Sequence, residues 1–220
     1  MNNKPDSCKP CRYWKVSHTL NRRPFYETIE GQGFCLPEGQ PHLGVTFIAE
    51  ASGEHEENDG LPLRPYAQAG SIHTRVLRSL LVSRGQTMAF NILACRPPNN
   101  DMGDNYGDVV SNCAVHRDAR IDVAMAIARS NPLVKQPIIV ALGEIAWSTL
   151  TGFGTDSRDK RSISYARGYP VQTRYGMVLG TFHPAFIRRN TKLLGVITED
   201  YRQAFRIARE GFHPLPRDYK

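Results

Sequence analysis

Short apolar runs alternate with longer amphipathic stretches along most of the chain. Four of the runs predict buried strands, because they are rich in β-branched and aromatic residues and end in small or polar ones. These predicted strands span residues 42–50, 87–95, 136–143 and 176–184. Apolar residues at helical spacing predict the helices between and after them. These predicted helices span residues 71–85, 109–131, 144–152 and 198–211, the last with Thr198 as its N-cap and Gly211 at its end.

The alternation of strands and helices indicates the fold class. Such units form parallel sheets that helices cover on both faces. We therefore expect an α/β protein, a three-layer α/β/α sandwich with a central, mainly parallel four-stranded sheet. Residues 52–70 and 96–108 are polar and rich in Gly or Pro, so we expect loops there. Residues 1–42 predict an irregular N-terminal arm, and the length favours one domain over residues 1–220.

The strand ends locate a candidate site. In a parallel sheet of this kind, ligands bind beyond the carboxyl ends of the strands. Glu50, Asn91 and His183 lie towards the carboxyl ends of predicted strands, and Tyr66 lies on the long loop after the first strand. A carboxylate, an amide, an imidazole and a flat ring suit a planar heterocycle with N–H and C=O groups, such as a nucleobase. Each also has a structural interpretation: Tyr66 as core, Asn91 and His183 as hydrogen-bonded structural groups, and Glu50 as a cap.

Composition and charge narrow the class of protein. Hydrophobic residues make up 40% and charged residues 22%, which excludes wholesale disorder. The 28 basic and 21 acidic residues give a net charge of +7, which favours a polyanionic partner. Residues 158–189 hold seven Lys or Arg and one acidic residue, whereas residues 50–59 are strongly acidic. No apolar run approaches ~18 residues and the N-terminus lacks a secretory signal, so we expect a cytoplasmic protein without a membrane span.

The five cysteines suggest a metal centre. Cys8 and Cys11 form a CxxC, whereas seventeen residues separate Cys95 from Cys113. Thiolates select zinc or an iron–sulfur cluster, and the wide second pair departs from the usual zinc spacing. The CxxC by itself is also compatible with a redox pair or with chance. We expect Cys35, which stands alone, to be a buried small apolar residue.

Several motifs together resemble the uracil-DNA glycosylase superfamily, and most closely its iron–sulfur family, family 4. They follow the order of the family and extend over nearly the whole chain. The run CRPPNN and the four-cysteine layout are the most specific of them. The matching segments are AEASG (49–53), DGLPLRPYAQAG (59–70), NILACRPPNN (91–100), ALGEIAW (141–147) and HPAFIRR (183–189).

The resemblance implies a function and a cofactor. It implies a monofunctional DNA repair glycosylase that flips uracil, or a related deaminated base, out of single- or double-stranded DNA. The enzyme would hydrolyse the N-glycosidic bond and leave an abasic site, and no lysine lies at the strand ends to form a Schiff base. The resemblance also implies a structural 4Fe–4S cluster held by Cys8, Cys11, Cys95 and Cys113. We expect a monomer, associated with the nucleoid if the source is bacterial.

The resemblance assigns roles to individual residues. Tyr66 matches the ring that stacks on the flipped base, and Asn91 matches the amide that pairs with its polar edge. His183 matches the histidine near the O2 atom of the base, and Glu50 matches the residue that positions water. The remaining matches form two groups. In one, the backbone lies close to the base; in the other, the side chains contact DNA. They are Ala49, Ala51 and Gly53 for the base, and Phe186, Ile187, Arg188 and Arg189 for the duplex and its phosphates.

Four positions depart from the family pattern. Ala49 replaces a glycine, Ser52 a proline, Tyr66 a phenylalanine and Ala185 a serine. These departures keep an alternative open, in which the chain binds DNA or a base without cleaving it, or acts on a different base.

Overall fold

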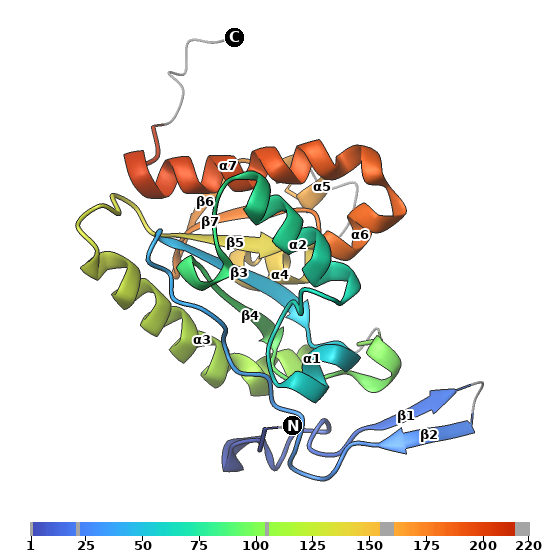
Figure 1. Ribbon diagram of the computed structural model, residues 1–220. Helices are drawn as coiled ribbons and strands as arrows, with labels where there is room; N and C mark the ends of the chain where they lie inside the picture. The colour runs from blue at the N-terminus through green and yellow to red at the C-terminus, as the bar shows by residue number, and fades with distance from the viewer. Residues whose placement is uncertain (1, 21–22, 104–105, 155–160, 214–220) are drawn as a thin grey trace.

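The computed structural model describes residues 2–20, 23–103, 106–154 and 161–213. Its centre is a five-stranded sheet with the strand order β4-β3-β5-β7-β6. Helices cover both faces of this sheet (Figure 1). The three pairings among β4, β3, β5 and β7 are parallel, and β6 joins the edge in antiparallel orientation. The strands are β3 (Val45–Ala51), β4 (Met88–Leu93), β5 (Ile138–Leu142), β6 (Pro170–Thr173) and β7 (Gly176–Thr181).

The predicted α/β class and the mainly parallel sheet are confirmed, but the sheet has one strand more than predicted. All four predicted strands are present. The missed strand β6 has four residues, begins with a proline and lies at an edge, where its side chains are only partly buried. It pairs with β7 as a hairpin, with Thr173 opposite Gly176. So short a segment lacks the apolar alternation from which a strand is predicted.

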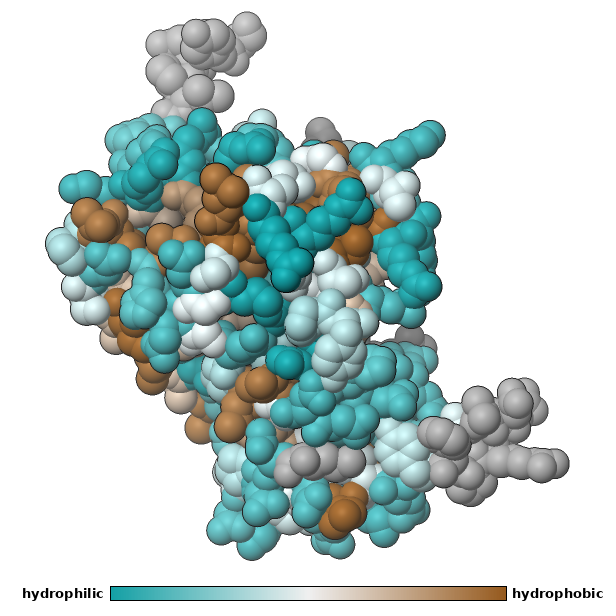
Figure 2. All heavy atoms as spheres, viewed as in Figure 1, coloured by the Kyte–Doolittle hydropathy of each residue, from teal (hydrophilic) through white to brown (hydrophobic). Residues whose placement is uncertain are grey.

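Alternate residues of the inner strands face two separate hydrophobic cores, which gives the protein its three layers. On one face, Phe47 and Val140 pack with α2 (Gln68–Ser79) and α7 (Leu194–Glu210). On the other, Ile48 and Ile139 pack with α3 (Gly107–Ser130) and α4 (Glu144–Thr151). The face seen in Figure 2 is mostly hydrophilic with separate small hydrophobic groups, because these helices turn their apolar sides to the sheet.

The boundaries of the last helix differ from the prediction at one end only. Gly211 ends α7 as expected, with φ of 89°. The helix begins at Leu194, four residues before the predicted N-cap Thr198. Thr198 lies inside the first turns, and its hydroxyl donates to the Leu194 carbonyl at 2.7 Å.

Two segments expected to be irregular contain regular structure. In the N-terminal arm, β1 (Ser17–Leu20) and β2 (Arg23–Glu27) form an antiparallel hairpin, which lies beside α1 at the edge of the molecule (Figure 1). The loop after β3 contains α1 (Glu54–Asp59). Two further short helices, α5 (Ile163–Ala166) and α6 (Pro184–Arg189), were also not predicted. Within the described ranges, no helix combines the length and apolar character needed to cross a bilayer.

Candidate active site

A cleft of about 500 Å³ opens at the carboxyl ends of the central strands. This volume lies in the range of small-molecule sites. The structure brings Glu50, Asn91 and His183 together on this cleft, although more than 130 residues separate the first from the last. Predicted residues that also line it are Ala49, Ala51, Gly53 and Arg189. Tyr66, Phe186, Ile187 and Arg188 are not among the lining residues.

Asn91 is held at the base of the cleft by hydrogen bonds from one end of its amide. Only 2% of Asn91 is exposed, and its Nδ2 donates to the Ser52 hydroxyl at 3.1 Å. The Ser52 hydroxyl in turn donates to the Ala94 carbonyl at 3.3 Å. Oδ1 of Asn91 is buried and has no hydrogen-bond partner among the described residues. Asn91, which lines the cleft, therefore keeps one buried acceptor without a partner among the described residues.

His183 is the N-cap of α6, and this position fixes its tautomer. Its Nδ1 accepts a hydrogen bond from the Ala185 backbone N–H at 3.2 Å. Burial lowers the pKa of His183 to about 4, so the ring is neutral at pH 7. A neutral imidazole that accepts at Nδ1 carries its proton on Nε2. The site thus offers an uncharged N–H donor that titrates only in acid.

Gly143 packs directly against His183. It follows β5 with φ of 92° and ψ of 170°, a conformation essentially restricted to glycine. A Cβ atom built at Gly143 would lie 3.0 Å from the Cβ of His183, tighter than ordinary van der Waals contact. A side chain at position 143 would therefore require His183 to move.

Glu50 is a partly buried carboxyl at the end of β3. Burial raises its pKa above the ordinary value of 4.5, and the nearby charge of Asp101 raises it further. No compensating hydrogen bond contributes to this shift. A carboxyl in such surroundings takes up a proton more readily than a solvated one and can exchange protons with water in the cleft.

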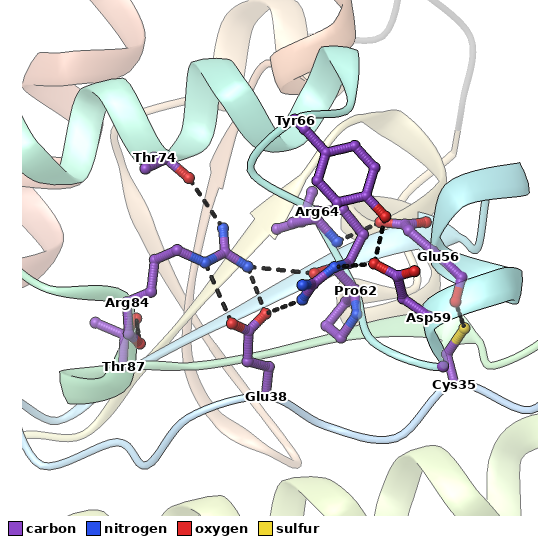
Figure 3. Close-up of polar contacts among 12 residues, drawn as sticks. Cys35, Glu38, Glu56, Asp59, Pro62, Arg64, Tyr66, Thr74, Arg84 and Thr87 are labelled. Carbon is purple, nitrogen blue, oxygen red and sulfur yellow. Dashed lines mark hydrogen bonds and ion pairs between the residues drawn. The ribbon is translucent and has the colours of Figure 1, made fainter. Parts of the chain in front are cut away.

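Tyr66 lies outside the cleft lining and is held there by a polar network (Figure 3). Its hydroxyl donates to the Asp59 carboxylate, which also accepts from Arg64 Nε at 2.8 Å. Glu38 connects Arg64 to Arg84, with ion-pair distances of 3.6 and 2.5 Å. The Tyr66 ring remains 60% exposed. The hydroxyl that distinguishes this residue from the family's phenylalanine therefore anchors the ring.

Two glutamates of the acidic segment 54–59 are held inside the protein by hydrogen bonds. Glu56 accepts hydrogen bonds from the backbone N–H groups of Gly53, at 2.6 Å, and of Leu63. Glu57 accepts from the hydroxyls of Thr28 at 2.9 Å and Tyr26 at 3.3 Å. Both glutamates are buried. These two carboxyl groups are thus directed into the protein and away from its surface.

Of the four residues that the resemblance assigns to DNA contact, three are exposed and one is buried. Phe186 is 45% exposed and available to a partner, whereas Ile187 is 1% exposed and packs in the core. Arg188 and Arg189 are exposed on α6. Of the basic segment 158–189, residues 158–160 lie outside the described residues. Two of its arginines make structural ion pairs, Arg167 with Asp200 at 2.7 Å and Arg174 with Asp118 at 3.2 Å.

The four cysteines of the predicted metal centre line one small apolar cavity. Cys8, Cys11, Cys95 and Cys113 all contribute to it. Burial raises the pKa of the Cys8 thiol, and the proximity of Cys113 and Cys11 raises it further. No group of three or more His, Cys, Asp or Glu within the described ranges is arranged to hold a metal ion. Cys35 is buried outside this set, as expected, and its thiol donates to the Glu56 carbonyl at 3.1 Å.

Two positively charged side chains, Lys4 and Arg120, act on the cysteine cavity. Lys4 lines it, is 6% exposed and donates to the carbonyls of Tyr13 and Trp14. Arg120 donates to the Cys35 carbonyl at 2.9 Å, and its positive charge lowers the pKa of the Cys113 thiol against the larger rise from burial. Among the described residues, no carboxylate lies within ion-pair distance of either cation. Buried cations are usually paired. The two positive charges therefore offset part of the rise that burial causes in the pKa of the thiols.

One short loop joins the cysteine cavity to the cleft. Cys95 lies in the cavity, whereas Pro97 and Asn100 line the cleft. Asn99 extends the connection to the hairpin, because its Oδ1 accepts from the Thr19 backbone N–H at 2.6 Å.

Comparison with known proteins agrees with this geometry. The model of the uracil DNA glycosylase superfamily matches residues 36–207. The chain belongs to this superfamily. A type-4 uracil-DNA glycosylase of Sulfurisphaera tokodaii is 30% identical over 207 residues, which cover 92% of this chain and 80% of the relative. One of Thermotoga maritima is 31% identical over 170 residues, covering 76% and 79%.

Sequence reasoning located the cleft of this uracil DNA glycosylase superfamily member but missed several residues that shape it. His55, Glu56 and Leu63 line the cleft and were not predicted as site residues. One available signal was His-Pro at residues 183–184, because proline is favoured at the first position of a helix. That signal predicts α6 and places His183 at its N-cap.

Proposed function

We propose that this protein is a monofunctional DNA repair glycosylase, a single domain over residues 1–220. It binds uracil or a related deaminated base after the base has left the DNA stack, hydrolyses the N-glycosidic bond and leaves an abasic site. The observation that carries the proposal is the neutral imidazole of His183 on the cleft that Asn91 also lines. The names of the type-4 relatives support the same reaction.

His183 stabilises the leaving base. As the N-glycosidic bond breaks, negative charge develops on the base and positive charge on the sugar. An N–H donor placed where the negative charge develops is worth about 3 kcal/mol in the transition state. The Nε2–H of His183 is such a donor, facing O2 of the base, and its neutrality leaves the proton on the enzyme.

Glu50 acts on the attacking water, and Asn91 recognises the base. The Glu50 carboxylate orients or activates the attacking water and offsets the positive charge on the sugar. Asn91 reads the polar edge of the base, and a base with the wrong pattern would leave buried polar groups unpaired. Ala49, Ala51 and Gly53 keep the wall of the cleft small enough for the base to approach the backbone.

The DNA contacts come from the exposed side of α6. Extruding a nucleotide costs a few kcal/mol, and an apolar side chain can occupy the space left in the stack. Phe186 is the exposed candidate for this role, and Ile187 supports it from the core. Arg188 and Arg189 bind phosphates. Tyr66, whose ring contacts that of His55 on the cleft, stacks on the extruded base.

We propose that Cys8, Cys11, Cys95 and Cys113 hold a structural 4Fe–4S cluster. The donor set fits, because four thiols line one apolar cavity that Lys4 also lines and whose thiols Arg120 influences electrostatically. A single tetrahedral ion would need its sulfur ligands within roughly 4 Å of one another, since each lies ~2.3 Å from the metal. A cluster accommodates more widely spaced thiolates. When bound, it would join the N-terminal arm to the loop after β4.

The direct test is release of uracil from DNA. We expect the purified protein to convert a labelled uracil-containing oligonucleotide into a product that alkali cleaves at the uracil position, with no strand break before alkali. Thymine and cytosine oligonucleotides serve as controls. Tight binding without cleavage would instead identify a non-catalytic binding protein. Release of only another deaminated base, such as hypoxanthine, would identify an altered specificity.

The rate of uracil release is expected to fall at acidic pH, and we expect this acid limb of the pH–rate profile to depend on Glu50. Its pKa is raised above 4.5, and the carboxylate is the active form, so the single-turnover rate falls as the pH drops through a value above 4.5. Glu50→Gln should lower the plateau by roughly 10²-fold. It should also move the acid limb towards pH 4, where His183 takes up its proton. An unchanged limb in Glu50→Gln would contradict the assigned role.

Gly143→Ala is expected to displace the His183 ring and lower the rate of uracil release by about 10-fold, with about 1–3 kcal/mol lost from the free energy of unfolding. Gly152→Ala is the matched control, since Gly152 also has positive φ, 75°, but a Cβ there would meet no atom within 4 Å. Rates and thermal unfolding of both variants separate backbone strain from displacement of the imidazole. Equal rates in the two variants would remove Gly143 from the positioning of His183.

A further inference from the structure

Ser52, where the family pattern has proline, constrains the orientation of the Asn91 side chain. Ser52 is 2% exposed and lines the cleft directly after β3. Its hydroxyl donates to the Ala94 carbonyl at 3.3 Å and accepts from Asn91 Nδ2 at 3.1 Å. A hydroxyl has a single hydrogen to donate. Because that hydrogen is engaged by Ala94, Ser52 can act towards Asn91 only as an acceptor.

Glu56 imposes the same orientation from α1. Burial raises the pKa of its carboxyl, and hydrogen bonds from the Gly53 and Leu63 backbones and from the Asn91 amide oppose that rise. Both carboxyl oxygens of Glu56 already accept from backbone N–H groups, so Glu56 faces the Asn91 amide as an acceptor. Rotating the amide of Asn91 by half a turn would place Oδ1 against both Ser52 and Glu56. The amide nitrogen therefore faces these two groups.

This arrangement leaves Oδ1 of Asn91 buried without a partner among the described residues. Leaving a buried acceptor unpaired costs about 1–3 kcal/mol, so such groups are rare in folded proteins without a functional reason. A ligand that brings a donor to Oδ1 removes this cost. The ring N–H on the pairing edge of uracil or hypoxanthine is such a donor, whereas cytosine and adenine have an acceptor nitrogen at the corresponding ring position.

We propose that Ser52 is a positioning residue that favours uracil over cytosine, and hypoxanthine over adenine, by turning the Asn91 amide. It engages Nδ2 and thereby presents Oδ1 as the acceptor for the ring N–H of the extruded base. The inference rests on the proposed glycosylase function, which it refines by naming the feature of the base that is read. Ser52 acts only through Asn91, and this dependence can be measured.

A double-mutant cycle tests the dependence. Ser52→Ala is expected to lower kcat/KM for uracil release by about 10-fold, and Ser52→Thr, which keeps the hydroxyl, should recover most of that loss. In the Asn91→Ala background, the same Ser52→Ala change should alter the rate less than about 2-fold, because the pair is coupled. Additive effects, or a Ser52→Ala rate equal to that of the wild type, would overturn the proposal.

A second measurement needs no activity and so separates this inference from the proposed function. The side-chain amide hydrogens of Asn91 can be followed by NMR and assigned by their loss in Asn91→Ala. We expect them to exchange with solvent about 10-fold more slowly in the wild type than in Ser52→Ala, with Ser52→Thr resembling the wild type. Equal exchange in the wild type and Ser52→Ala would refute the role of Ser52. Absence of uracil release by the wild type would refute only the glycosylase.

Discussion

Replacing His183 by alanine is expected to lower the rate of uracil release by about 10²–10³-fold, the usual effect of removing one donor to a developing anion. The expectation follows from the geometry of the ring. Nδ1 is occupied by the Ala185 N–H, and burial lowers the pKa to about 4, so Nε2–H is a neutral donor at every pH above about 5. Single-turnover kinetics on a uracil-containing oligonucleotide measure the effect without interference from product release.

Two further variants separate catalysis from folding. His183→Asn retains a side chain that caps α6, so it should keep the ~1 kcal/mol that an N-cap contributes while still losing the rate. His42→Ala changes an exposed histidine that is not among the cleft residues and should match the wild type. If His183→Ala retained more than about a tenth of the wild-type rate, the imidazole would not be the principal donor.

Cys113→Ser is expected to abolish the broad absorbance near ~400 nm of the purified protein, because it removes one of four ligands of the proposed cluster. We also expect it to reduce the free energy of unfolding by at least ~3 kcal/mol, since the binding energy of a structural metal centre contributes to folding. The loss should be large here because the cluster would hold the N-terminal arm. Visible spectra, iron content and thermal unfolding give the three readouts.

Cys35→Ser provides the matched control for the cluster. Cys35 is buried close to the same region but is not among the residues that line the cysteine cavity. A serine hydroxyl can keep the hydrogen bond to the Glu56 carbonyl, so colour and iron content should persist. A colourless wild-type protein containing one zinc per chain, or equal loss of colour in both variants, would contradict the assignment.

The sheet was predictable because its inner strands are buried on both faces and so consist of continuous apolar runs. The cleft was predictable for a related reason, since parallel strands bring their carboxyl ends to one edge and so bring Glu50, Asn91 and His183 together. The edge strand β6 has no such pattern. Its four residues are defined mainly by pairing with β7, which is a tertiary contact.

The helix α1 shows a second reason why the sequence pattern alone did not predict the whole structure. Its sequence, EHEEND, resembles a solvated loop, because acidic side chains are almost never fully buried unless they are paired. The structure buries Glu56 and Glu57 by supplying backbone N–H groups and hydroxyls from segments that are distant or irregular. The roles of Tyr66 and Ser52 depend in the same way on partners that a linear pattern does not reveal.

The loop from Cys95 to Asn100 spans only six residues, yet it contributes to the cysteine cavity at one end and to the cleft at the other. The arm that carries Cys8 and Cys11 is therefore connected through this loop to the wall of the cleft. Deleting residues 2–11, or cutting the chain after them with a protease, would free that wall without altering any residue in it. Shortened versions of this protein designed for crystallisation or engineering should accordingly keep the N-terminus.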